Sequence, residues 1–196
     1  MRTTRSHLVR RIRPLSAVLL LCSTILASAR DTFAAAGQPS QSDVEAVYLF
    51  DFGKFVRWPA GADQGPLRIC IAGTDAFAAA LRKTVSNETI GSRPLDVRLL
   101  MHPGDEAGCA ILFIEATEHA HLDELLQAVA TRPTLTVSDT PDFLSHGGMI
   151  QFQLVEKRVR FSINLNAVNR AHLGMSSELL KVALSVKGKM PEGGAE

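Results

Sequence analysis

The chain has 196 residues, of which 46% are hydrophobic and 21% are charged, and its formal net charge is +1 at pH 7. Residues 1–29 hold five of the 21 basic residues and none of the 20 acidic ones, so the rest of the chain has a formal charge of −4. An acidic chain of this kind argues against nucleic acid as a partner. The 167 residues after residue 29 are enough for one domain with a core, and no change of composition predicts a second one.

The first 29 residues have the organisation of a secretory signal peptide, which is removed on export. Arginines are followed by an apolar run over residues 15–26 and by a small-residue cleavage site at Ala27-Ser28-Ala29. A second cleavage site near residue 36 is the alternative. The apolar run is shorter than the roughly 20 residues of a transmembrane helix, and Leu21 disfavours a lipid anchor on Cys22. We therefore predict an exported protein.

Residues 42–58 are expected to form the first helix. Ser42 and Glu45 have the spacing of a capping box, apolar residues recur three or four positions apart, and a proline follows the segment. Leu49 and Phe50 lie outside the main apolar stripe, so the helix should bury a second side, which a partner chain could cover. The candidate partner-binding residues of this helix are Leu49, Phe50, Lys54 and Trp58.

Strands and helices then alternate up to residue 137. Helices should begin after Thr74 and Thr117, whose hydroxyl groups would cap them. Such alternation is typical of a mostly parallel sheet with helices on both faces. The predicted strands cover residues 67–72, 95–101, 110–114 and 134–137.

From Met149 the apolar period changes to two, which predicts an antiparallel hairpin that turns at Glu156-Lys157. One face of this hairpin is polar. It either reaches into water or forms a recognition surface for a ligand or a protein. The candidate contacts on this face are Arg158, Arg160 and Asn164.

Two capped helices are expected at the C-terminal end. Asn164 should cap a short helix that Gly174 closes, and Ser176 should cap a last helix with apolar residues up to Val186. Residues 188–196 are expected to form a flexible tail. The sequence thus predicts one α/β domain over residues 42–187. Its architecture would be a three-layer sandwich, with a mostly parallel central sheet, an antiparallel C-terminal hairpin and helices on both faces.

Cys70 and Cys109 remain once the signal peptide is removed, one inside a predicted strand and one just before another. Adjacent strand edges could bring the two side chains within bonding distance. Exported proteins usually pair an even number of cysteines, so a disulfide is favoured over two buried free thiols. Such a bond would close a loop of roughly 40 residues and stabilise the fold by roughly 4 kcal/mol.

The residues that could carry catalysis form no established motif. Gly73-Thr74-Asp75 follows a strand but lacks the glycines of a nucleotide-binding loop, and His119 and His121 lack the spacing of zinc ligands. Ser138 and Asp139 end a strand, where α/β proteins often bind small molecules, yet Ser138 lies in no G-x-S-x-G motif. We therefore expect no enzymatic activity, metal or cofactor. Ser138 and Asp139 remain candidate contacts for a small-molecule sensor or carrier, which is one of two functions that the sequence favours over a hydrolase built on Ser138 or a histidine.

Seven segments along the chain, taken together, carry a more specific signal. They are YLFDFGKFVRWP at 48–59, CIAG at 70–73, CAILFI at 109–114, LTVSD at 135–139, GGMI at 147–150, RFSIN at 160–164 and SSELL at 176–180. In order and spacing they resemble the YfiR (HmsC-like) family of small bacterial periplasmic proteins.

This resemblance implies the other function, a regulator that is not an enzyme. Such a regulator binds the periplasmic sensor portion of an inner-membrane diguanylate cyclase and represses it, which limits cyclic di-GMP and biofilm formation. The resemblance also implies a homodimer and a disulfide between Cys70 and Cys109. The second disulfide of the family, near the Gly-Gly-Met segment, has no counterpart here, because Ser145 and Phe152 stand in that region.

Overall fold

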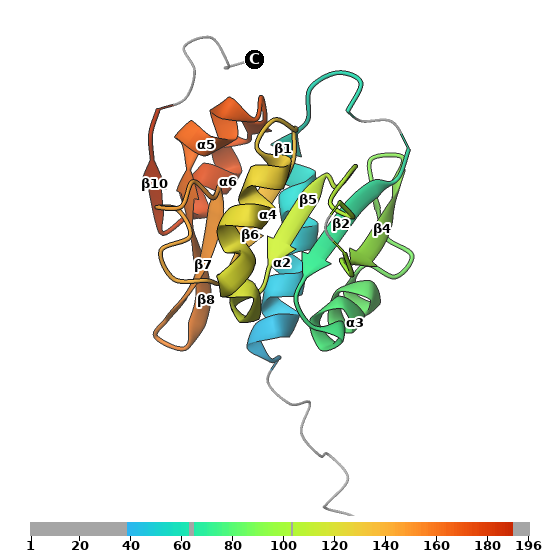
Figure 1. Ribbon diagram of the computed structural model, residues 1–196. Coiled ribbons are helices and arrows are strands. Elements are labelled where there is room, and N and C mark those ends of the chain that lie inside the picture. The colour runs from blue at the N-terminus through green and yellow to red at the C-terminus, as the bar shows by residue number, and fades with distance from the viewer. Residues whose placement is uncertain (1–38, 63–64, 103, 190–196) are drawn as a thin grey trace, which may run out of the picture. The chain divides into compact units, whose positions relative to one another are not determined.

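A computed structural model describes residues 39–62, 65–102 and 104–189 (Figure 1). The predicted signal peptide, both of its cleavage sites and residues 190–196 of the predicted tail lie outside these described residues. All of the elements below belong to the unit that begins at Pro39. Over the described ranges, no helix combines the length and the apolar character that crossing a membrane requires.

Within the described residues the strands form one eight-stranded sheet in the order β10-β8-β7-β6-β5-β2-β4-β3. Neighbours pair in parallel, except for the antiparallel pairs β7/β8 and β3/β4. The predicted mostly parallel sheet with an antiparallel C-terminal hairpin is therefore confirmed. The strands are β2 (Leu67–Ala72), β3 (Thr89–Ile90), β4 (Arg93–Leu99), β5 (Ile111–Ile114), β6 (Leu135–Ser138), β7 (Ile150–Val155), β8 (Arg158–Asn164) and β10 (Ser185–Lys187). A separate antiparallel pair joins β1 (Val56–Arg57) to β9 (Gly174–Met175).

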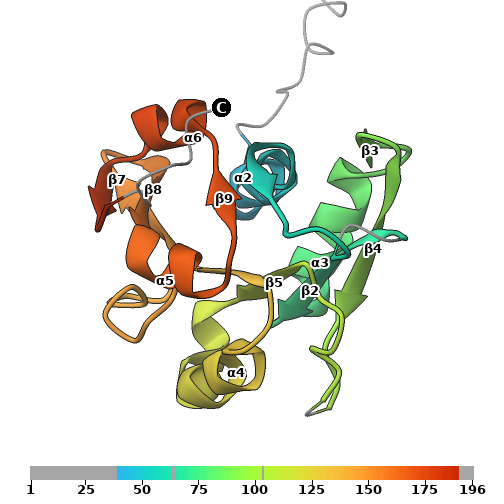
Figure 2. The ribbon, with the colours of Figure 1, turned by 90° about the horizontal axis from the view of Figure 1, so that it is seen from above.

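Helices cover both faces of this sheet, as the alternating pattern predicts. Figure 2 shows α2 and α4 on opposite sides of β5. One hydrophobic cluster joins α2 and α3 to the side chains that one face of the sheet presents, among them Ile71 and Phe113. A second cluster joins α4 to the opposite face, among them Cys70 and Leu112. The helices are α2 (Gln41–Phe55), α3 (Asp75–Thr84), α4 (Leu122–Val129), α5 (Leu165–Arg170) and α6 (Ser177–Val182), with a 3-10 helix η1 (Ala116–His121) before α4.

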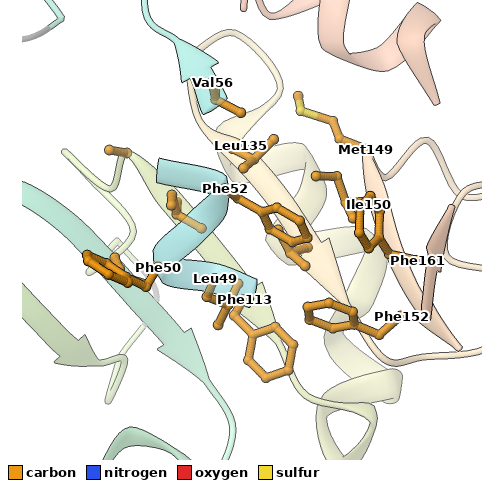
Figure 3. Packing of buried hydrophobic residues seen from close by; sticks show 14 of the residues in the cluster. Leu49, Phe50, Phe52, Val56, Phe113, Leu135, Met149, Ile150, Phe152 and Phe161 are labelled. Carbon is orange, nitrogen blue, oxygen red and sulfur yellow. The ribbon is translucent and has the colours of Figure 1, made fainter. Parts of the chain in front are cut away.

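Aromatic rings fill the space between α2 and the C-terminal hairpin (Figure 3). The ring of Phe52 lies 5.8 Å from that of Phe152 and 5.1 Å from that of Phe161, measured between centroids. All three side chains are almost completely buried. Burial of a large aromatic side chain contributes on the order of 2–3 kcal/mol, so this cluster ties α2 firmly to the hairpin.

Helix α2 begins and ends at other residues than we predicted. Ser40 caps the helix, and Asp43 completes the capping box. Glu45 cannot take part in a cap, because its side chain is buried on the inner face of the helix. The helix ends at Phe55, where the chain becomes extended and enters β1 before Pro59. The prediction of Ser42 and Glu45 as the cap was therefore wrong by two residues.

The capping residues that we predicted mark the starts of the other helices, with one exception. The side chains of Thr74, Asn164 and Ser176 accept backbone N–H groups and cap α3, α5 and α6 as predicted. Thr117 caps nothing, since residue 117 lies inside η1, where hydrogen bonds tighten the chain before α4 begins. Both turn residues of the hairpin, Glu156 and Lys157, have positive φ, as in a two-residue type I′ turn.

The C-terminal end departs from the prediction in two places. His172, with φ of 56°, follows α5 in the left-handed conformation that often ends a helix, whereas Gly174, which we expected to close this helix, begins β9. The last helix stops at Val182 rather than continuing to Val186, because residues 185–187 form β10 and pair in parallel with β8. The pairing supplies backbone hydrogen bonds that compete with those of a longer helix.

Candidate functional site

The disulfide between Cys70 and Cys109 is formed, with its Cα atoms 5.8 Å apart. Cys70 lies inside β2 and is completely buried, and Cys109 precedes β5 with an exposed fraction of 4%. The bond therefore crosses from one strand to its parallel neighbour within the cluster beneath α4. Because it is shielded from solvent, it is suited to holding the long connection between β4 and β5 onto the sheet.

The carboxyl ends of the parallel strands are the usual ligand-binding edge of an α/β sheet. Here the turn after β2 is occupied by a side chain of the same protein. The backbone N–H and the hydroxyl of Thr74 both donate to the carboxylate of Glu115, which follows β5. A Cβ atom at Gly73 would overlap that carboxylate. Glu115 thus takes the position at the start of α3 where a phosphate would bind in a nucleotide-binding fold.

Ser138 and Asp139 also serve the fold at this edge. The hydroxyl of Ser138, which is completely buried, donates to the carbonyl of Ile114 over 2.6 Å and accepts the N–H of Thr140 over 2.9 Å. Asp139 Oδ1 accepts the N–H of Ala116 over 2.7 Å, at the start of η1. Burial raises the pKa of Asp139, although this hydrogen bond opposes the shift. Both side chains thus form hydrogen bonds that hold the backbone at this edge, and Ser138 is completely buried.

Glu45 is a buried carboxyl group that we had assigned to a helix cap. It is 3% exposed on the inner face of α2, and Gln41 Nε2 donates to its Oε1 over 2.8 Å. Burial raises the pKa of Glu45 to about 7, and the negative charges of Asp139 and Glu115 add to the shift. Glu45 lies four residues before Leu49 and seven before Phe52, so the helical period could have placed it on the buried face.

The candidate contacts on α2 and after it separate into two groups. Leu49 is fully buried and Phe50 is 8% exposed, so the second apolar side of α2 is covered by the protein's own core and not by a partner chain. Lys54 is exposed, binds Asp51 over 2.9 Å, and lies 3.8 Å from the ring centre of Phe50. Trp58 is half-buried beyond the end of α2.

The polar face of the hairpin divides along its length. Arg158 and Arg160 are exposed, whereas Gln151 and Ser162, nearer the centre of the sheet, are buried. Ser162 Oγ donates to Gln153 Oε1 over 3.0 Å, and Asn164 Nδ2 donates to the carbonyl of Leu144 over 3.3 Å. Only the outer part of this face is therefore open to a partner, and Asn164 has a structural role.

Histidine clusters do not form a metal centre in the part of the chain that is described. His119 and His121 are both exposed on η1, and His121 Nδ1 lies 3.1 Å from Glu118 Oε2. Among the described residues, no group of three or more metal-ligating side chains is close enough to hold an ion.

The predicted site residues thus lie in three separate regions, which are the carboxyl edge of the sheet, the end of α2 and the outer hairpin. The sequence analysis missed the roles of Glu45 and Glu115. The carboxylates of both residues bind groups within the molecule, and Lys54 binds Asp51, whereas the exposed Arg158 and Arg160 have no ion pair among the described residues. This arrangement fits recognition by surface contact better than chemistry in a pocket.

Comparisons with known proteins agree with the fold and add a family. A family model described as YfiR/HmsC-like matches residues 42–184. A crystal structure of a conserved domain protein from Vibrio cholerae is similar, with a TM-score of 0.55 and 9% sequence identity over 77% of this chain, and the match spans 62% of that chain. At this identity the likeness concerns the fold alone. A 3-hydroxyacyl-CoA dehydrogenase from Archaeoglobus fulgidus matches with a TM-score of only 0.33, 11% identity and coverage of 64% and 58% of the two chains, and it supports no argument.

Proposed function

Because the chain belongs to the YfiR/HmsC-like family, we propose that it is an exported periplasmic regulator of diguanylate cyclase signalling. Members of this family are periplasmic regulators rather than enzymes. In the finer form of the proposal, this protein binds the periplasmic portion of an inner-membrane diguanylate cyclase and represses it. Cyclic di-GMP and biofilm formation then stay low.

The observation that carries the proposal is the family match over residues 42–184, which includes every strand of the sheet except the last. Two features support it independently. A buried disulfide is suited to the oxidising periplasm. In addition, the carboxylate of Glu115 binds Thr74 at the start of α3, where an α/β enzyme would hold a phosphate group, which favours a role based on binding.

For the partner surface we propose the outer hairpin, with Arg158 and Arg160 as its contacts. Both arginines are exposed on β8, and neither has an ion pair among the described residues. A guanidinium group that is not yet paired can bind a carboxylate of a partner through two parallel hydrogen bonds. An acidic patch on the cyclase would therefore be the complementary surface.

The first experiment deletes the gene and measures intracellular cyclic di-GMP. The level should rise and return to normal when the wild-type gene is supplied, and an unchanged level would count against repression. In the second experiment the deletion strain receives a gene that encodes Arg160→Glu. A gene that encodes Arg82→Glu, at an exposed position of α3, is the matched control. Arg160→Glu should fail to restore the low level and should lose binding to the purified periplasmic domain of the cyclase, whereas the control should behave as wild type.

We also propose that the protein is a homodimer, as its family implies. Sedimentation equilibrium of the mature protein should give the mass of two chains at micromolar concentration. A monomer under these conditions would contradict this part of the proposal without affecting the repression experiment.

A further inference from the structure

A cleft rich in arginine lies at the amino edge of the parallel strands, opposite the edge described above. It has a volume of about 370 Å³ and lies where β2, β5 and β6 begin. Arg68, Arg93 and Arg132 line it together with Trp58. None of its lining residues in the described ranges is acidic. Three positive side chains around one cleft are unusual in a chain whose charge is −4 outside its first 29 residues.

Two of the three guanidinium groups are held in place by the fold. Arg68 Nε donates to Asp96 Oδ2 over 3.0 Å, but the same oxygen also accepts Arg98 Nε over 3.0 Å, so one carboxylate serves two cations. A Cβ atom at Gly108, which has φ of 80°, would lie 2.9 Å from Arg68 Nη1, so a glycine leaves room for this guanidinium group.

Arg93 binds backbone carbonyl groups just before β2. Its Nε donates to the carbonyl of Gly65 over 2.9 Å, and its Nη2 donates to that of Pro66 over 3.2 Å. These are neutral acceptors, so the charge of Arg93 is not compensated by them. For Arg132 the described residues offer no ion pair and no side-chain hydrogen bond. The cleft therefore holds two guanidinium groups in fixed positions, those of Arg68 and Arg93. Within the described chain, neither Arg93 nor Arg132 has a carboxylate partner.

An aromatic ring completes the lining. Trp58 is half-buried, and its Nε1 donates to the carbonyl of Ala110 over 3.3 Å, which orients the indole ring beside the start of β5. A flat apolar surface next to cationic donors suits a ligand that has an aromatic body and an acidic group. The cleft volume lies in the range of roughly 300–1,000 Å³ that small-molecule sites have.

We propose that this cleft binds a small aromatic anion, with its carboxylate or phosphate group held by Arg68, Arg93 and Arg132 and its ring packed on Trp58. Guanidinium groups bind both kinds of oxyanion through paired, charge-assisted hydrogen bonds. The site is distinct from the carboxyl edge and from the outer hairpin. It does not depend on the proposed regulation of a cyclase.

The chain contains a single tryptophan, so intrinsic fluorescence reports directly on this cleft. Mature protein is titrated with benzoate, with phenyl phosphate, with inorganic phosphate and with benzylamine, at constant ionic strength. Benzoate or phenyl phosphate should change the fluorescence of Trp58 saturably, and the stronger of the two identifies the acidic group. Benzylamine should give no saturable change because its charge is positive, and inorganic phosphate should bind more weakly than phenyl phosphate.

Arg132→Gln is the test variant, and Arg82→Gln is its matched control, since Arg82 is an exposed arginine of α3 that does not line the cleft. Arg132→Gln should weaken binding about tenfold, because a hydrogen bond to a charged group is lost, while the control should bind as wild type. Thermal unfolding shows whether each variant is folded. The proposal is overturned if neither anion gives a saturable change up to about 10 mM, a concentration beyond which binding is too weak to be specific. Equal binding by Arg132→Gln and wild type, or equal binding of benzylamine, would also overturn it.

Discussion

Replacing Glu45 with glutamine should stabilise the protein at pH 8 and have little effect near pH 4.5. The carboxyl group is 3% exposed, and burial raises its pKa from 4.5 to about 7. Glutamine has nearly the same shape, and its amide oxygen can still accept the N–H group of Gln41 that now binds Oε1. The substitution therefore removes the ionisation and leaves the packing intact.

The sign of the effect follows from proton binding in the two states. Below pH 4.5 the carboxyl group is protonated in both the folded and the unfolded protein, so it gives no pH dependence. Between pH 4.5 and about 7 the folded state binds the proton more tightly, so the free energy of unfolding of the wild type falls as the pH rises. Above this window the full cost of ionising a buried group is present, about 3 kcal/mol at most, since each unit of pKa corresponds to about 1.4 kcal/mol.

Urea unfolding of wild type and Glu45→Gln at pH 4.5, 6 and 8 measures this difference. The variant should gain stability over the wild type progressively with pH. Glu88→Gln is the control, because Glu88 is exposed and has no side-chain hydrogen bond among the described residues. If the stability difference of Glu45→Gln is the same at pH 4.5 and pH 8, or if the variant is less stable at pH 8, the assignment of Glu45 as a buried acid with a raised pKa is wrong.

Three further substitutions test other parts of the structure by the same unfolding assay. Replacing both Cys70 and Cys109 with alanine should lower the free energy of unfolding by about 4 kcal/mol, because the unfolded chain gains the freedom of a 39-residue separation. Phe52→Ala should lower the free energy of unfolding by about 3–5 kcal/mol, because it leaves a cavity in the core. Its control is Val47→Ala on the same helix, where the side chain is 47% exposed, and this substitution should change stability by less than about 0.5 kcal/mol. Glu115→Ala should cost about 1 kcal/mol, because the N–H at the start of α3 loses its acceptor.

For each of these substitutions, one result would contradict the structure. A double cysteine variant as stable as the oxidised wild type would mean that the bond constrains little. Equal losses in Phe52→Ala and Val47→Ala would contradict the burial of one face of α2. No loss in Glu115→Ala would mean that its carboxylate does not hold the turn after β2.

Features that depend on a few neighbouring residues could be predicted from the sequence. The strand over residues 67–72 was located with both of its ends, since a short, mostly apolar run is visible in the sequence without any distant contact. Thr74, Asn164 and Ser176 cap helices as expected, because a capping side chain binds backbone within three residues. The apolar residues at every second position from Met149 likewise predicted the hairpin of β7 and β8.

Features that depend on which surfaces meet were settled by the tertiary structure. The sequence alone determined the α/β architecture, the six longest strands to within about two residues at most ends, and most helix starts, because local hydrogen bonds and apolar periods encode them. The short strands β1, β3, β9 and β10 were not predicted. Whether Glu45 caps α2 or lies beneath it, whether Phe50 faces a partner or the core, and where β10 pairs were decided by contacts between distant segments. The same holds for the cleft of Arg68, Arg93 and Arg132, since Arg68 and Arg93 lie at the starts of β2 and β4 and Arg132 precedes β6, so they meet only when the strands lie side by side.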